Sequence, residues 1–522
     1  MRKLSVLAVA ATMLFGTSAC GDLAVENLNA PDAARALANP GDVEALISGA
    51  WISWWQPTYW SGPGPWLSNV AFQHSAYPAN FGMVHFSQIP RVPTTNSTAF
   101  GFYTEISWAY TAWNRAIAAV NDGLRAILVD KTVDLGADEA RAVAWGRFVQ
   151  GLAYGYLALL YDEGPLVDET TDLEQTPEFV GYQELMARSL EYLDEAHAIA
   201  STNAFTVPDT WIWLTTESMT STQFARYIRS FKARLRANLA RTPEERAAVN
   251  WNAVLADAQA GDPLAYTTTR VGFRSNWSLY YMLLRGWGQM SYFVHGMADQ
   301  SGQYQEWMGL PVEQRTPILP SGPFLVQTPD LRFPQGETIE EQRANPGVRL
   351  MMVATPGDQW SRPDRGEWRW SYYHDVRSPL LGIQGTLWDI APAELDMLAA
   401  EAHYRLGNRA AAADLINKTR VPAGLNATNA DGLNTSCVPK LPNGQCGDLF
   451  EMLKWEKRME AGFNHGLVNA SWYFNGRGWG DLMQGSILQL PVPDLVAQLA
   501  NRPTRDYGGN LEFGAPVGTY GY

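Results

Sequence analysis

The chain has 522 residues, of which 46% are hydrophobic, and a formal net charge of −14 at pH 7. This composition is that of a globular protein with a sizeable core. The acidic balance excludes nucleic acid and polybasic docking on anionic lipid as main partners, because both need clustered Lys and Arg.

The first twenty residues follow the pattern of a lipoprotein signal peptide. Arg2 and Lys3 form a basic start, and residues 4–14 form an apolar stretch too short to span a bilayer. Small residues then lead directly to Cys20, as at a cleavage site where the cysteine is lipidated. We therefore expect residues 1–19 to be removed and Cys20 to carry the lipid anchor, including palmitate. The alternative is an ordinary secretory peptide followed by an unrelated cysteine.

Only two other cysteines are present, Cys437 and Cys446, in a segment rich in Asn, Gly and Pro. In an oxidising compartment such a pair indicates a disulfide that clamps a loop. Two free thiols are the alternative, and a metal site would need more ligands than these two residues provide.

Helical periodicity begins after an irregular N-terminal part. Residues 21–50 indicate a tether and then a short helix that starts near Asn39. Residues 51–100 are aromatic and broken by Pro and Gly, and we expect ordered irregular structure there. Apolar residues then recur at helical spacing through several segments. The expected helices cover residues 103–128, 138–161, 181–200, 222–241 and 244–260. The last of these is expected to have Thr242 as its N-cap and Pro243 as its first residue.

The second half alternates between irregular and helical sequence. Residues 262–391 lose the period and are rich in Gly, Pro and aromatic residues, whereas helices resume at 392–420 with tetratricopeptide-like spacing of small residues. One more helix, 448–461, lies among Gly-rich loops. The predicted fold is mainly α, a scaffold of helix pairs with long aromatic-rich insertions at about 51–100 and 262–391. No linker divides it, so we expect residues 20–522 to form a single composite domain.

Four groups of residues, in this order along the chain, resemble the SusD/RagB family. The first is Cys20 followed by a helix near residue 40. The second is the helix that begins Arg-Phe-Val-Gln-Gly at 147–151 and ends Leu-Tyr-Asp-Glu-Gly-Pro at 160–165. The third is Glu-Ala at 401–402, Gly-Asn at 407–408, Ile-Asn at 416–417 and Arg420. The fourth is Glu-Lys-Arg-Met-Glu at 456–460, then Arg477, Asp-Leu at 481–482 and Leu-Pro-Val-Pro at 490–493.

The resemblance implies a helical repeat core and a binding role without catalysis. It implies a lipid-anchored, surface-exposed protein of the outer membrane that delivers a nutrient, best known as a glycan, to a TonB-dependent barrel transporter of the SusC-like kind. Peptides and other nutrients stay open as ligands. One departure is residues 462–476, which lengthen a link that is short in the family.

Two segments, 54–85 and 273–307, combine aromatic rings with polar side chains, as a sugar-binding site requires. Rings pack against the C–H faces of a sugar, while amides and charged groups bind its hydroxyls. The predicted ligand-binding residues are Trp54, Trp55, Tyr59, Trp60, Trp66, His74, Asn276, Trp277, Tyr281, Arg285, Trp287 and Trp307. The alternative for each single ring is core packing, because Trp is highly buried on average. The sequence leaves open which segment forms the site and whether calcium is bound.

Signals for catalysis are poor. The seven His form no zinc-binding helix motif, and nucleophile-elbow, phosphate-loop and dinucleotide-binding motifs are absent from the sequence. We therefore expect no enzyme, no cofactor and no metal. Two other classes stay open: a surface glycoside hydrolase with an unmarked pair of carboxylates, and a tetratricopeptide-type scaffold for protein assembly.

Overall fold

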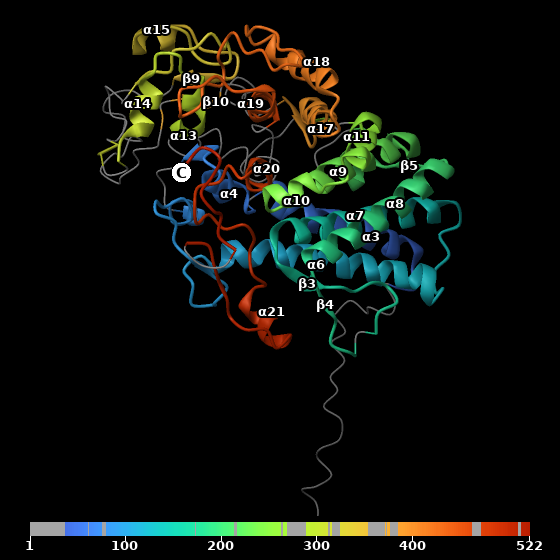
Figure 1. The fold of residues 1–522 in the computed structure, drawn as a ribbon. Helices are drawn as coiled ribbons and strands as arrows, with labels where there is room; N and C mark the ends of the chain where they lie inside the picture. Colours follow the sequence, from blue (N-terminus) through green and yellow to red (C-terminus); the bar gives the residue numbers. More distant parts are fainter. Residues whose placement is uncertain are drawn as a thin grey trace, which may run out of the picture.

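The computed structural model describes residues 37–60, 62–75, 80–172, 174–212, 217–262, 265–268, 289–311, 314–315, 324–352, 371, 373–375, 385–461, 471–509 and 513–522. This part of the chain is mainly helical, with only short strands, as the sequence predicts (Figure 1). The longest helices gather in one half of the molecule, and shorter helices, strands and loops form the other half.

The first described helix, α3, spans Pro40–Trp55. Asn39 caps it by accepting a hydrogen bond from the backbone N–H of Gly41 at 2.9 Å, so the predicted helix start is confirmed. The helix runs further than expected, into the segment predicted to be irregular. Its buried face consists of Val43, Ile47, Ala50, Trp51, Trp54 and Trp55. These residues follow helical spacing, so the three tryptophans continue an apolar stripe.

Four long helices build the first repeats. They are α6 (Tyr103–Leu124, continued by the π-turn η3, Arg125–Val129), α7 (Glu139–Leu160), α8 (Tyr182–Thr202) and α9 (Ser221–Asn238). The predicted positions are confirmed to within a few residues. Helix α7 packs closely against α8 at Gly151, where the absence of a side chain leaves room for Leu193. A Cβ at Gly151 would lie 2.6 Å from Cγ of Leu193.

The helix predicted over 244–260 is wrong as a single element, since the structure has two. Thr242 caps α10 (Pro243–Ala247) by accepting from the backbone N–H of Glu245, as predicted. A second cap follows at once, because Asn250 accepts from the N–H of Ala253 at 3.1 Å and starts α11 (Trp251–Ala260). The sequence signal for the break is therefore Asn250, a favoured capping residue within the apolar period.

The later repeat is also confirmed. Helices α17 (Pro392–Arg405) and α18 (Arg409–Arg420) are joined by a turn in which Gly407 has a φ of +84°, and α19 (Leu449–Ala461) follows. Two further helices, α20 (Ser471–Trp479) and α21 (Asp494–Leu499), replace expected loops. The glycines of α20 suggested a loop, but Gly478 serves close packing: a Cβ there would lie 3.2 Å from the carbonyl oxygen of Ala240.

The remaining elements are short. The other helices are α4 (Gly64–Val70), α5 (Met83–Phe86), α13 (Tyr292–His295), α14 (Gln303–Gly309) and α15 (Ile339–Ala344), with single turns η1 (Gln56–Trp60), η2 (Asn80–Gly82), η4 (Gly136–Asp138), η5 (Asp209–Trp211) and η6 (Gly296–Ala298). The strands form antiparallel pairs: β1 (His74–Ser75) with β8 (Gln289–Met290), β2 (Thr94–Thr95) with β12 (Asp506–Tyr507), β3 (Glu163–Pro165) with β4 (Phe179–Gly181), β5 (Thr206–Val207) with β6 (Met219–Thr220), β7 (Ala265–Thr268) with β11 (Gly385–Trp388), and β9 (Leu350–Met352) with β10 (Tyr373–Asp375).

Buried apolar side chains form two clusters. The helix core lies among α3, α6, α7, α8, α9, α11 and α17, and the insertion core lies around Tyr292, Phe293, Trp307, Phe324, Tyr373 and Trp455. Buried ion pairs join the repeats to each other. Arg234 on α9 binds Glu394 on α17 through two hydrogen bonds of 2.8 Å, and Arg246 on α10 binds Glu401 in the same two-pronged way.

Candidate functional site

The two segments predicted to bind ligand meet in space. Strand β1, in the first segment, pairs with β8, in the second, so that His74 lies opposite Met290. Beside this pair the ring of Phe72 stacks on Phe293, with ring centroids 4.3 Å apart. The sequence left open which segment forms the site, and the structure joins both in one region.

Three of the predicted tryptophans are core residues. The side chains of Trp54, Trp55 and Trp66 are 0%, 3% and 0% exposed. Trp54 meets the rings of Tyr156 and Phe231 edge to face, at centroid distances of 5.4 and 5.7 Å. A ring enclosed in this way cannot stack on a ligand from solution. The prediction that these three rings contact the ligand is therefore wrong for this structure, and core packing describes them.

Two more predicted residues are buried at the edge of the insertion core. His74 is fully buried, and its Nδ1 lies 3.1 Å from the hydroxyl of Ser68. Trp307 on α14 is 3% exposed and packs against Phe293, with ring centroids 5.5 Å apart. Neither side chain reaches the surface, so their predicted ligand contacts are also corrected to packing. They support the wall behind the junction of β1 and β8.

The other residues predicted to bind ligand stay predictions. Tyr59 and Trp60 belong to the π-turn η1, and their side chains lie outside the described residues. The remaining five also lie outside the described residues: Asn276, Trp277, Tyr281, Arg285 and Trp287. Strands β7 and β8 flank this second group in the sequence, so β8 ties its far end to the first segment.

Three buried histidines surround the junction. His74, His295 and His374 come from β1, α13 and β10, and each is at most 1% exposed. Burial lowers the pKa of His74 well below its ordinary value, and the nearby His295 and His374 lower it further. Burial, followed by the charge of Arg458, lowers the pKa of His295 to about 3. His74 and His295 are therefore neutral at physiological pH. The described residues contain no cluster of three His, Cys, Asp or Glu that could hold a metal.

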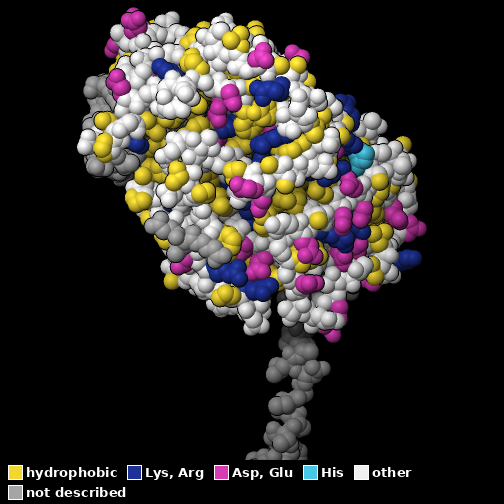
Figure 2. Space-filling model, in the orientation of Figure 1, with side chains coloured by type: hydrophobic (Ala, Val, Ile, Leu, Met, Phe, Trp, Pro, Cys, Tyr) yellow, Lys and Arg dark blue, Asp and Glu magenta, His cyan; other side chains and the backbone are white. Residues whose placement is uncertain are grey.

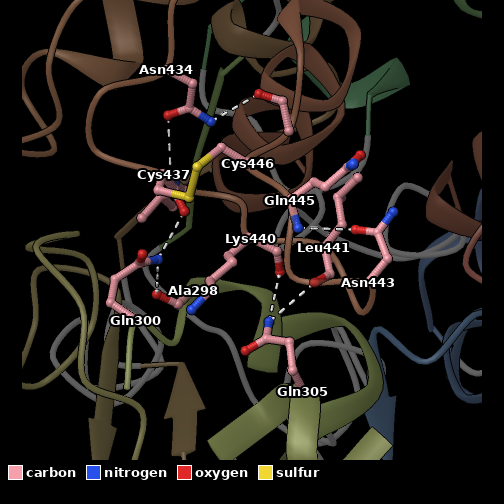
Figure 3. The surroundings of a disulfide bond; sticks show 12 residues. Ala298, Gln300, Gln305, Asn434, Cys437, Lys440, Leu441, Asn443, Gln445 and Cys446 are labelled. Atoms are coloured by element: carbon pink, nitrogen blue, oxygen red, sulfur yellow. Dashed lines mark hydrogen bonds between the residues drawn. A yellow bond between two sulfur atoms is a disulfide. The ribbon is translucent and has the colours of Figure 1, made fainter. Parts of the chain in front are cut away.

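The predicted disulfide between Cys437 and Cys446 is confirmed, with Cα atoms 4.7 Å apart. Figure 3 shows how the surrounding loop is tied to the insertion core. The side-chain amide of Gln300 donates to the carbonyl of Cys437 at 2.8 Å, and that of Gln305 donates to the carbonyl of Leu441 at 3.1 Å. The disulfide therefore holds a loop that covers the insertion core.

A pocket that the sequence analysis missed is lined by residues of β3, β4, α10 and the C-terminal segment. We call it the corner pocket; its volume is about 440 Å³. It is lined by Asp162, Glu163, Gly181, Tyr182, Gln183, Arg241, Thr242, Glu245, Leu488, Gln489, Arg505, Tyr507 and Phe513. The signal for it was Asp162-Glu163, two charges directly after an apolar helix, which the sequence analysis used only as a family motif.

Asp162 organises one wall of the corner pocket. Its carboxylate accepts hydrogen bonds from the backbone N–H of Glu163 at 2.9 Å and of Val492 at 3.1 Å, and from the hydroxyl of Tyr507. Burial raises the pKa of Asp162, while the hydrogen bond from Tyr507 opposes that rise. The carboxylate thus fastens the C-terminal segment to the end of α7. Figure 2 shows acidic and basic side chains next to one another near α21, at this end of the molecule.

The lipid attachment predicted at Cys20 stays a prediction, because this residue lies outside the described residues. Among the helices that the structure describes, none combines the length and apolarity needed to cross a bilayer.

Solved structures with this fold are SusD-like proteins. A SusD homolog from Bacteroides thetaiotaomicron superposes with a TM-score of 0.50 at 13% identity, over 91% of this chain and 98% of that one. A SusD superfamily protein from the same species superposes with a TM-score of 0.47 at 13% identity, over 89% of this chain and 97% of that one. A SusD-like carbohydrate binding protein from Bacteroides vulgatus gives 0.43 at 17% (83% of each chain). No family model and no curated protein matches the sequence. The fold is SusD-like, as the sequence resemblance predicted.

Proposed function

We propose that this protein is a SusD-like lipoprotein of the outer membrane that binds an oligosaccharide at the cell surface. It delivers the ligand to a TonB-dependent barrel transporter and does not catalyse a reaction. The observation that carries the proposal is the junction of β1 and β8, because it brings two aromatic-rich insertions together on a SusD-like scaffold. Cys20 provides the lipid anchor.

The binding surface in this proposal consists of the predicted residues whose side chains lie outside the described part of the chain. They are Tyr59, Trp60, Asn276, Trp277, Tyr281, Arg285 and Trp287. Their aromatic rings pack against sugar C–H faces, and their amide and guanidinium groups bind hydroxyls. The buried Trp66, His74 and Trp307 support this surface from behind, since a precise site needs a rigid base.

Affinity electrophoresis tests the proposal. A soluble chain that begins at Asp22 is run in native gels that contain different polysaccharides. Retardation by one glycan is expected, with loss of at least tenfold in affinity for Trp277→Ala and Trp287→Ala. The matched control is Trp108→Ala, a half-buried tryptophan on α6 outside both insertions. Unchanged affinity in both insertion variants would place the site elsewhere.

Two further readouts separate this role from the alternatives. Release of shorter oligosaccharides during incubation would establish a hydrolase and refute the non-catalytic role. Purification of the full-length lipoprotein from membranes is expected to bring a large β-barrel with it. If other proteins co-purify and the barrel does not, an assembly scaffold is favoured.

A further inference from the structure

The corner pocket contains a buried amide that the described residues leave without a hydrogen bond. Gln489 lines the pocket and is 3% exposed, yet its side-chain amide bonds to no described residue. Such an amide normally has a partner, because leaving it without one is costly. The backbone beside it is fixed, since the N–H of Leu488 donates to the carbonyl of Phe513 at 3.0 Å and that of Leu490 to the carbonyl of Leu160 at 2.7 Å. The amide is thus held in place for a group that enters the pocket.

The charged groups of the pocket neutralise one another. The lining contains three carboxylates, of Asp162, Glu163 and Glu245, and two guanidinium groups, of Arg241 and Arg505. Arg505 pairs with Asp162 at 3.3 Å, and Glu163 pairs with Arg502 at 3.2 Å. Glu245 accepts two hydrogen bonds, of 2.6 and 2.8 Å, from other residues of the lining. The small excess of charge is negative, so the pocket disfavours an anion, and its carboxylates are already engaged.

An exposed aromatic ring forms the apolar side of the pocket. Phe513 is 38% exposed, and its ring packs against the buried ring of Tyr507 with centroids 4.7 Å apart. The φ of Phe513 is +60°, in the left-handed region that a bulky residue rarely adopts, so the backbone carries strain at this position. A ring held in this way can pack against the apolar face of a ligand.

Room and chemistry together define the class of ligand. The volume of about 440 Å³ falls in the range of small-molecule sites. An amide both donates and accepts hydrogen bonds, so it suits a hydroxyl, which does the same. Gln183, exposed in the same lining, adds a second amide. An uncharged ring that carries hydroxyls on its edge and C–H groups on its face matches the amides and the ring of Phe513.

We propose that the corner pocket is a second ligand site, which takes one uncharged sugar unit. The face of the sugar packs against Phe513, and its hydroxyls bind the amide of Gln489. No residue of β1 or β8 belongs to the described lining, so this site is distinct from the junction of those strands. The choice of a sugar rests on the proposed function, whereas the requirement for an uncharged, hydroxylated ring rests on the pocket.

Calorimetric titration with glucose, galactose and mannose tests this site in the chain that begins at Asp22. The three sugars are uncharged and differ only in the configuration of their hydroxyls. We expect saturable binding of at least one of them. Gln489→Leu should weaken it about fivefold, because the hydrogen bond from the amide is lost. Phe513→Ala should weaken it about fivefold, because the ring contact is lost.

Two controls separate binding from folding. Gln484→Leu changes an exposed glutamine outside the lining and should leave binding unchanged. Gln489→Leu should unfold at no lower a temperature than the wild type, because its amide makes no hydrogen bond within the described structure. A lower unfolding temperature would give Gln489 a structural role and overturn its part in the site. Phe513→Ala, at an exposed position, tests the pocket independently of that result.

Three further results would overturn the proposal: binding of none of the three sugars, binding that neither pocket variant weakens, or binding that Trp277→Ala and Trp287→Ala abolish. The outcome is separate from that of the proposed function. Retardation in polysaccharide gels depends on Trp277 and Trp287, whereas the monosaccharide titration depends on Gln489 and Phe513. Each result is therefore judged by its own variants.

Discussion

The helix core and the insertion core are held together in different ways. The helix core is built from long helices whose apolar stripes and small residues interlock. Apart from α19, which contributes Trp455 and Met459, the insertion core has no described helix longer than α14, and side chains bind its loop backbone directly. Tyr292 donates to the carbonyl of Phe324 at 2.8 Å, and the backbone N–H of Val326 donates to the hydroxyl of Tyr373 at 3.0 Å. Where regular secondary structure is missing, polar side chains form the hydrogen bonds that buried backbone N–H and C=O groups need.

Arg332 shows how concentrated this support is. Its guanidinium binds Asp330 through two hydrogen bonds of 2.8 Å and Glu456 on α19 through bonds of 2.7 and 3.1 Å. All three side chains are at most 1% exposed. One residue thus joins the insertion core to the last repeat helices, whereas the helix core spreads its stability over many contacts.

The largest expected effect comes from breaking this junction. Arg332→Met leaves the buried Asp330 without an ion-pair partner among the described residues and leaves Glu456 only the more distant Arg420, at 3.7 Å. We therefore expect the free energy of unfolding to fall by about 3–5 kcal/mol in urea denaturation. Arg226→Met is the control, because its pair with Asp262 at 3.2 Å is exposed and contributes about 0–1 kcal/mol. Equal losses in the two variants would contradict the central role of Arg332.

The helix repeats have their own buried charge, and it predicts a pH dependence. Burial disfavours ionised Glu401, but Arg246 outweighs burial and lowers its pKa from 4.5 to about 2. Ionised Glu401 therefore stabilises the fold above about pH 4.5, and this contribution, of about 3 kcal/mol, is lost as the pH falls toward 2. Glu401→Gln should lower stability at pH 7 and flatten its decline between about pH 5 and 2. A decline as steep as in the wild type would refute the assignment.

Opening the disulfide tests the loop that covers the insertion core. We expect Cys437→Ser with Cys446→Ser to lower the free energy of unfolding by about 2–3 kcal/mol, because the unfolded chain regains the entropy of the closed loop. Thermal unfolding with and without a reducing agent gives the measurement. The reducing agent should shift the wild type and leave the double variant unchanged; an equal shift in both would point to another cause.

The smallest expected effect concerns two glycines of the helix core, one at a close helix contact and one in open space. A Cβ at Gly151 would lie 2.6 Å from Leu193 and 3.0 Å from the backbone oxygen of Ser189, so Gly151→Ala should destabilise by about 1–3 kcal/mol. Gly49→Ala on α3 meets nothing within 4 Å and should stabilise by about 0.5–1 kcal/mol. Thermal unfolding that shifts in the same direction for both variants would contradict the close approach of α7 and α8.

Much of the helical half could be predicted because its signal is local. The stripes of α6 to α9 recur at helical spacing, and the caps at Asn39 and Thr242 mark starts that the structure confirms. The errors have physical causes too. Asn250 interrupts a continuous apolar period with a second cap, and the glycines of α20, which suggest a loop, serve a close contact with another helix.

The candidate site was harder to predict, because burial of a single ring depends on what packs over it. Trp54, Trp55 and Trp66 look the same in the sequence as rings that could bind a sugar, and only their neighbours place them in the core. The corner pocket escaped for a related reason. Its walls come from Asp162, Arg241 and Phe513, which lie far apart along the chain and carry no common motif.

The sequence by itself determined the helical class, the caps and the disulfide pair, because these follow from the spacing of neighbouring residues. The tertiary structure alone decided which rings are buried and that the two insertions meet at β1 and β8. These properties depend on contacts between distant segments, and their energies are set by the exclusion of water, which no local pattern records.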